Sequence, residues 1–449
     1  MKKIKSMIVG ILIVALLAAL AVFPLAACDG PDTNNGGGGG GGPVAGQTVQ
    51  RIEDLIEEML GSFLPGVDLE MVNQMVEVVL GDDLVSTFVG LLNDSGFNNA
   101  QVNRLLDFVE GLEDLLPDFD EDEDVDDMSM FFVMMEIASA SAGLNIPNAT
   151  IAAFYWETIM LAYNVLDRVL EIFGDEFDSY ELEDINMVIE MIGMFKEFGR
   201  SEFIASYALL LDIQSVLSNS VINNMETILT ASDISRAVIR TMTTSIRNDM
   251  IAILNLLDNN GIQRIVNLFR LQLSFMPEDE YINISAIDTM LDAFVADWRY
   301  LRNSLLAMAN ALNNTIADAI YDTIVGVENE VFSYRQAQDR FIIISARVFN
   351  AGLTANNGIN YTRARTLLAS YRAIFADLLD HPADLADMNE WFDEMEYLVP
   401  YLFNDTAAIA ALGFNASLDA FEENAFVISM RMLFDEIGEV IGEQEVYLI

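Results

Sequence analysis

The sequence is almost devoid of histidine, cysteine and lysine. One His and one Cys in 449 residues exclude an internal disulfide, the usual zinc sites and an H-E-x-x-H peptidase. Basic residues of any kind are scarce, since 22 Lys and Arg stand against 70 Asp and Glu and give a formal charge of −48. Because binding to a phosphate backbone needs a basic face, we expect no nucleic-acid partner. Apolar residues nevertheless make up 53% of the chain, which is typical of a folded protein and not of an acidic disordered tail.

The first 28 residues have the layout of an export signal. Lys2, Lys3 and Lys5 form a positively charged start, and the stretch from Met7 to Ala27 carries no charge. A membrane-spanning helix is the alternative, because about 20 apolar residues can cross a bilayer. Export is favoured because small residues precede Cys28, the only Cys of the chain, and the sequence turns polar directly after it.

The end of this stretch, Leu25-Ala26-Ala27-Cys28, resembles the cleavage motif of bacterial lipoprotein signals, in which a Leu and two small residues precede Cys. The resemblance covers the first 28 residues only. It implies cleavage between Ala27 and Cys28, a diacylglyceryl thioether on the Cys28 sulfur and acylation of the new amino group. Two or three acyl chains, at ~0.8 kcal/mol per buried CH₂, hold a protein stably. The partner implied is the bacterial cell membrane, with the protein facing outside the cytoplasm.

Three segments follow from this interpretation. Residues 1–27 are the signal peptide, residues 28–47 are the lipidated Cys and a flexible Gly-rich tether, and residues 48–449 are the body. The tether contains seven consecutive glycines from Gly36 to Gly42. A chain of this composition forms no stable element, and about 19 residues of it reach roughly 25 Å.

The body is predicted to be all-α, a large bundle-like arrangement of a dozen or more helices, because apolar residues recur at steps of three and four. One apolar stripe continues from Ile287 to Ile316, and a long helix is expected to begin near Ser285. The segment 257–261, Leu-Asp-Asn-Asn-Gly, predicts a helix end. We expect no β-sheet and no membrane-spanning helix in the body. Domain seams are expected near 117–127 and 276–284.

An acidic run between residues 118 and 127 contains eight carboxylates in ten positions. Hard cations relieve such repulsion, so a weak Ca²⁺ site is one expectation. The EF-hand template fails, because Glu123 stands where Gly is required and Ser129 where Glu is required. The alternative is a solvated acidic loop without a metal. The calcium ligands, if any, would be Asp118, Asp120, Asp122 and Asp124.

Other chemistry-bearing residues favour structural roles. His381 lies before Pro382 and is expected at a helix end or on the surface. Met residues at helical spacing usually fill gaps in cores, although a Met-lined groove for an apolar partner is an alternative. Tryptophans can stack on sugars, but here they fall in helical periodicity and are predicted to be core residues. The residues concerned are Met187, Met191, Met194, Trp156, Trp298 and Trp391.

These observations favour a membrane-anchored lipoprotein with a non-catalytic role, either in binding a protein or small molecule or in the structure of the envelope. The alternative is a carboxylate-dependent hydrolase that acts on glycans outside the cytoplasm. With 70 acidic residues, the sequence does not single out a catalytic pair. No catalytic residue is therefore assigned, and no cofactor is expected apart from Ca²⁺ at the acidic run.

Overall fold

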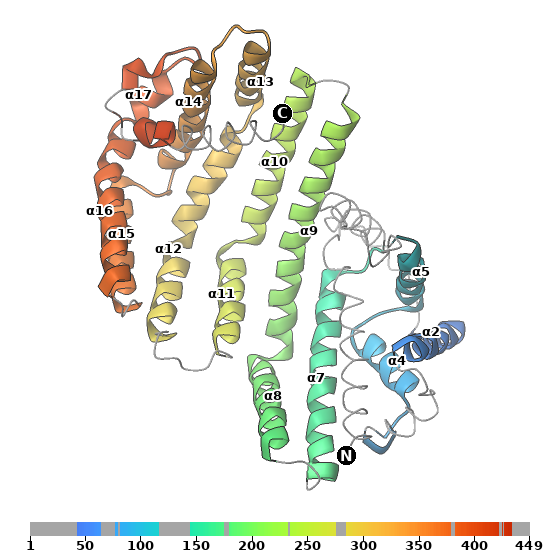
Figure 1. Cartoon of the computed structure of the whole chain (residues 1–449). Coiled ribbons are helices and arrows are strands. Elements are labelled where there is room, and N and C mark those ends of the chain that lie inside the picture. Colours follow the sequence, from blue (N-terminus) through green and yellow to red (C-terminus); the bar gives the residue numbers. More distant parts are fainter. Residues whose placement is uncertain are drawn as a thin grey trace, which may run out of the picture. The chain divides into compact units, whose positions relative to one another are not determined.

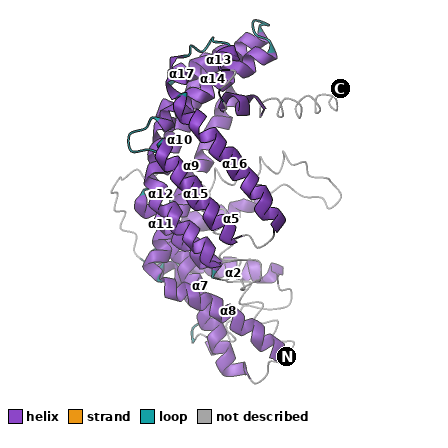
Figure 2. Cartoon of the chain, turned by 90° about the vertical axis from the view of Figure 1, so that its left-hand side faces the viewer, coloured by secondary structure: helices purple, strands orange, loops and turns teal. Residues whose placement is uncertain are grey.

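The computed structural model describes residues 43–63, 77–79, 81–115, 144–174, 179–231, 234–274, 284–378, 382–421, 424 and 426–432. These residues form helices joined by loops, and no strand occurs among them, so the predicted all-α fold is confirmed (Figure 2). No helix within this part of the chain has the length and apolar character needed to cross a membrane.

The chain divides into two compact units. Unit 1 comprises Met1–Ile222 and Asn267–Phe275, and unit 2 comprises Asn223–Val266 and Met276–Ile449. Two helices, α9 (Arg200–Thr230) and α11 (Asn259–Leu273), contribute residues to both units. The seams predicted near 117–127 and 276–284 fall outside the described residues, apart from Ile284, and stay predictions.

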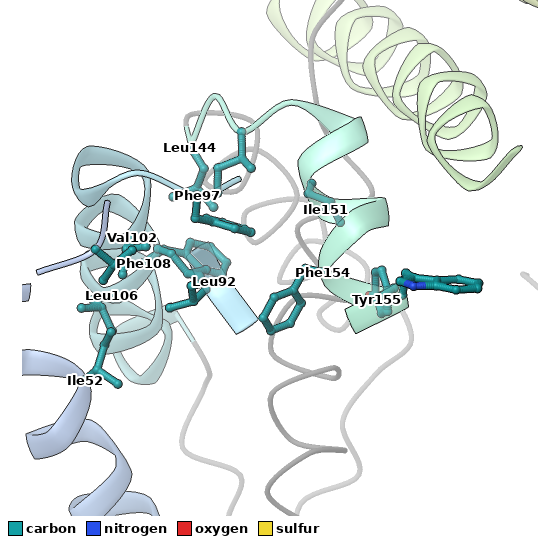
Figure 3. Close-up of a cluster of buried hydrophobic side chains, with 14 of the residues drawn as sticks. Ile52, Leu92, Phe97, Val102, Leu106, Phe108, Leu144, Ile151, Phe154 and Tyr155 are labelled. Carbon is teal, nitrogen blue, oxygen red and sulfur yellow. The ribbon is translucent and has the colours of Figure 1, made fainter. Parts of the chain in front are cut away.

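Unit 1 is built around a core of large apolar side chains. Phe154 lies at its centre with 1% of its surface exposed, and the edges of Phe88 and Phe97 meet its ring at centroid distances of 6.2 and 5.9 Å (Figure 3). Asp83 accepts a hydrogen bond from the backbone N–H of Ser86 and so caps the helix that carries Phe88. Among the described residues, the helices lying wholly in unit 1 are α2 (Gln47–Phe63), α4 (Leu84–Asp94), α5 (Asn99–Leu115), α7 (Asn148–Phe173) and α8 (Ser179–Phe198).

A second group of aromatic rings joins α7 to the first half of α9. Trp156 and Tyr155 of α7 lie 5.5 and 5.1 Å from Phe203 and Tyr207 of α9. Burial raises the pKa of both tyrosines, whose hydroxyl groups hydrogen-bond to each other. Each hydroxyl group thus has a hydrogen-bond partner within an otherwise apolar contact between the two helices.

Unit 2 is a set of helices packed side by side (Figure 1). α12 packs against α10, α14 and α15, while α13 packs against α10 and α14; α16 packs against α15 and α17. The elements are α10 (Arg236–Leu256), α12 (Ile284–Ala311), α13 (Asn314–Glu328), α14 (Tyr334–Leu353), α15 (Tyr361–Leu378), α16 (Pro382–Asn404), α17 (Thr406–Ala411) and the 3₁₀ turn η3 (Leu418–Phe421).

The centre of unit 2 is helix α14. Its run Ile342-Ile343-Ile344 is buried at 0–5% exposure, because neighbouring elements cover more than one face of the helix. Ser333 and Gln336 form a capping box at its start. Residues of the C-terminal part of unit 2 cover Ile342 and Ile343, namely Ile409, Leu418, Phe421 and Val427.

Two predicted boundaries are wrong in detail, and a third is confirmed. The stripe from Ile287 to Ile316 belongs to two helices, because the Asn313 side chain accepts hydrogen bonds from the N–H groups of Thr315 and Ile316 and so caps the start of α13. The expected long helix is present as α12, and its start at Ile284 confirms the predicted start near Ser285. The segment 257–261 does end a helix at Leu256, yet Gly261 already belongs to α11.

Candidate functional site

The end of the predicted tether is fixed to unit 1 by side-chain amides. The N–H of Val44 donates to Asn93 Oδ1 at 2.8 Å, and Val44 itself is 4% exposed. Asn99 holds both neighbours, since its Nδ2 donates to the carbonyl of Pro43 at 3.1 Å and its Oδ1 accepts from the N–H of Ala45 at 3.0 Å. The chain is therefore bound to the folded body from Pro43 onward.

Helix α2, which follows directly, continues this attachment. Gly46 has φ +64°, a left-handed conformation that Gly adopts without strain, and α2 starts at the next residue. Arg51 of α2 donates to Asn103 Oδ1 at 2.9 Å and to Asp107 Oδ1 at 2.7 Å on α5. Asn103 in turn donates to Thr48 Oγ1 at 2.9 Å. These bonds connect the tether end to α5 and to the core of unit 1.

Carboxylates of unit 2 bind arginines of neighbouring helices. Arg240 of α10 donates Nε and Nη2 to the two oxygens of Asp318 on α13, both at 2.7 Å. The guanidinium carbon of Arg236 lies 4.7 Å from the ring centroid of Tyr321. Arg236 donates a hydrogen bond to Asp322, and its Nη1 lies 3.3 Å from Asp318 Oδ1. The hydrogen bonds from Arg240 and Arg236 lower the pKa of Asp318, so this carboxylate stays ionised to a lower pH than an ordinary Asp side chain does.

A second guanidinium between α12 and α15 has the same surroundings. Arg363 of α15 lies 3.2 Å from the ring centroid of Tyr300 and donates to Asp297 Oδ1 at 2.8 Å. In both places one helix presents a carboxylate and, three residues later, a tyrosine ring. Each guanidinium thus has a counter-charge and a π face beside it, with Asp297 hydrogen-bonded to Arg363 and Asp318 in an ion pair with Arg236.

Among the described residues, Asp339 has a raised pKa, which is a feature of a catalytic acid. Burial raises its pKa, and the nearby charge of Asp419 acts in the same direction. The charges of Arg431 and Arg335 oppose this rise, and Arg431 Nη2 lies 3.6 Å from Asp339 Oδ1. A general acid of a glycosidase needs a raised pKa and a partner carboxylate across a cleft. Asp339 meets the first condition.

The predicted site residues fall largely outside the described part of the chain. Cys28, Ala27 and His381 lie there, and so do the candidate calcium ligands Asp118, Asp120, Asp122 and Asp124. Among the described residues, no group of three or more His, Cys, Asp or Glu side chains is arranged to hold a metal ion. Lipidation and the Ca²⁺ site therefore stay predictions.

The tryptophan and methionine predictions are partly wrong. Trp156 and Trp298 are core residues as predicted, at 6% and 7% exposure. Trp391 on α16 is 52% exposed and Met187 on α8 is 55% exposed, so neither belongs to a core. Met191 and Met194 are half-buried on the same helix as Met187.

The buried Arg340 was not predicted from the sequence. Arg340 of α14 is 6% exposed, donates to Thr323 Oγ1 at 2.9 Å and to Asn415 Oδ1, and lies over the ring of Phe332 at 4.4 Å. Burial lowers its pKa from the usual value. A signal was present in the sequence, because residues 334–372 contain six Arg and one acidic residue in a chain of charge −48.

Comparison with known protein families, with curated proteins and with solved structures finds no match to this chain.

Proposed function

We propose that this protein is a lipoprotein anchored to the outer face of a bacterial cell membrane and that its helical body binds a partner without catalysis. The observation that carries the proposal is the order of three features along the chain. An apolar leader ends in Leu25-Ala26-Ala27-Cys28, a Gly-rich segment follows, and residues 43–45 are bonded into the core of unit 1. This order suits a body that is attached to the membrane at one defined point.

The attachment point shortens the free tether. Because the chain is bound from Pro43 onward, the segment between Cys28 and the body is 29–42. A Gly-rich chain of that length spans roughly 20 Å on average. On this proposal the body stands just beyond the lipid headgroups and turns freely about its anchor. Such an arrangement favours contact with other components at the membrane surface.

Binding is favoured over hydrolysis by the way in which the described carboxylates are used. Asp318, Asp297 and Asp393 each accept a hydrogen bond from an arginine of another helix, which holds helices together. A glycoside hydrolase needs a pair of carboxyls that face a substrate. The carboxyl with a raised pKa, Asp339, also lies beside an arginine, since Arg431 Nη2 is 3.6 Å from its Oδ1.

Replacement of Cys28 tests the anchor. In a bacterium that processes lipoproteins, Cys28→Ala should abolish incorporation of labelled palmitate and leave the leader uncleaved, because the thiol that carries the diacylglyceryl group is gone. The matched control is Ala27→Gly, which keeps a small residue before the Cys and should be labelled and cleaved like the natural sequence. Equal labelling of Cys28→Ala and the natural sequence would contradict the proposal.

A further inference from the structure

The spacing of a carboxylate and a tyrosine three residues later occurs four times in the sequence. Glu278 and Tyr281 lie outside the described residues. In the described pair Asp297/Tyr300, Arg363 of a neighbouring helix donates to the carboxylate and lies over the ring. In the pair Asp318/Tyr321, Arg236 lies over the ring and forms an ion pair with the carboxylate at 3.3 Å. The remaining pair is Glu394 and Tyr397 on α16.

On a helix, residues three apart lie on the same face, so each pair presents its carboxylate and its ring to one ligand. Tyr300 and Tyr321 are half-covered, as expected for rings under a guanidinium. Tyr397 is 62% exposed, and among the described residues neither Tyr397 nor Glu394 makes a contact with an arginine or lysine. The third pair thus repeats the spacing of the other two without a cation.

The surroundings of this pair are acidic and aromatic. Asp387 and Glu390 lie on the same face of α16 and are exposed, and Trp391 at its edge is 52% exposed. The opposite face of the helix carries the buried Phe392 and Val399, which belong to the interior of unit 2. Figure 2 views unit 2 from the side on which α16 lies in Figure 1. We call the exposed set Asp387, Glu390, Trp391, Glu394 and Tyr397 the α16 face.

We propose that the α16 face binds an arginine-bearing helix of another protein, with a guanidinium seated between the Glu394 carboxylate and the Tyr397 ring. This inference rests on the proposed binding function and names the chemistry of the partner. The internal pairs supply the model for the contact, because Arg236 and Arg240 reach Asp318 from one helix at a spacing of four residues. Asp387 and Glu390 would receive further basic residues of the partner helix.

The net charge of the chain favours another protein, and not a second copy of this chain, as the partner that binds the α16 face. A formal charge of −48 makes two copies repel each other, whereas a basic helix is attracted to the carboxylates of the α16 face. Arginine is favoured over lysine because its flat guanidinium both stacks on a ring and hydrogen-bonds a carboxylate in a fixed geometry. The partner is therefore expected to be basic and rich in arginine.

The test measures binding of a probe peptide to the full mature protein, purified from membranes in detergent. The probe is a fluorescent alanine-based helix with two arginines four residues apart, and a second probe carries lysines in their place. Glu394→Gln combined with Tyr397→Ala should weaken binding of the arginine probe about tenfold at low salt, since it removes one exposed ion pair and one cation–π contact. The lysine probe should bind the natural sequence more weakly than the arginine probe does.

The matched control is Glu328→Gln combined with Tyr334→Ala. It removes the same charge and a tyrosine that is 58% exposed, but the residue three positions before Tyr334 is Val331, not an acid. The control should keep the Kd within about twofold of the natural value. Melting by circular dichroism should show that both double variants are folded, as expected for exposed substitutions.

Three results would overturn the inference. One is an equal loss of affinity in the α16 variant and the control, and another is an unchanged Kd in the α16 variant. The third is a dimer of the natural protein in sedimentation velocity that the α16 variant loses, because a second copy would then be the occupant. If one of these results is found while Cys28 is still lipidated, the proposal of a membrane anchor is unaffected. Only the proposed binding of an arginine-bearing helix to the α16 face is then excluded.

Discussion

Replacing Phe154 with alanine is expected to destabilise the protein by about 3–5 kcal/mol, the cost of emptying a fully buried aromatic site. Phe154 is 1% exposed, and the rings of Phe88 and Phe97 meet it edge-on from other parts of unit 1. The α4 segment and α7, which are distant in sequence, thus lose one shared contact. The free energy of unfolding, measured by denaturant titration with circular dichroism, checks this result.

The matched control for Phe154→Ala is Phe269→Ala. Phe269 belongs to the α11 segment assigned to unit 1 and is 43% exposed, so its removal opens no comparable cavity. Its loss should stay below about 1 kcal/mol. The assignment of Phe154 to the centre of the core would be wrong if both variants lost the same stability.

Replacement of Trp298 should have the second large effect. Its ring is 7% exposed among Leu254 and Ile262, and its Nε1 donates to the carbonyl of Leu257 at 2.6 Å, just past the end of α10. Trp298→Ala removes both the ring and the bond and should cost about 3–5 kcal/mol. Trp298→Phe keeps an aromatic ring and should cost about 1–3 kcal/mol, because the part-buried Leu257 carbonyl loses its donor.

Trp391→Phe is the control for the second of these variants. Trp391 is 52% exposed, so the same exchange should change the free energy of unfolding by no more than about 0.5 kcal/mol. Both variants are compared by denaturant titration. Equal losses at positions 298 and 391 would show that the bond from Trp298 to Leu257 contributes nothing to stability.

The helical fold was readable from the sequence because apolar residues repeat at helical spacing through the body. Helix ends were less readable, since they depend on single polar residues. The apolar stripe continues unbroken across Asn313, and only the hydrogen bonds of that side chain reveal that one helix stops and another starts. The same periodicity could not decide between Trp391 and Phe392, which lie 100° apart on α16. Phe392 points inward, at 3% exposure, and Trp391 does not.

The candidate binding surface was harder to predict from the sequence than the helical fold, because it depends on tertiary structure. The spacing of Glu394 and Tyr397 is visible in the sequence, but only the fold shows that the equivalent pairs on α12 and α13 hold arginines. Buried Arg340 was not predictable from its type, because Arg is among the residues that are seldom fully buried. Thr323 and Asn415, which hydrogen-bond to it, come from distant positions in the sequence.

The mass of the N-terminal peptide of the mature protein, isolated from its own membrane, tests the lipid anchor most directly. The result predicted is a peptide that begins at Cys28 and carries a diacylglyceryl group on the Cys28 sulfur. Residues 43–45 are hydrogen-bonded to unit 1, so an acylated Cys28 would hold the whole body at the membrane surface through the predicted tether. A peptide that begins at Met1, or a mature chain with an unmodified Cys28 thiol, would contradict it.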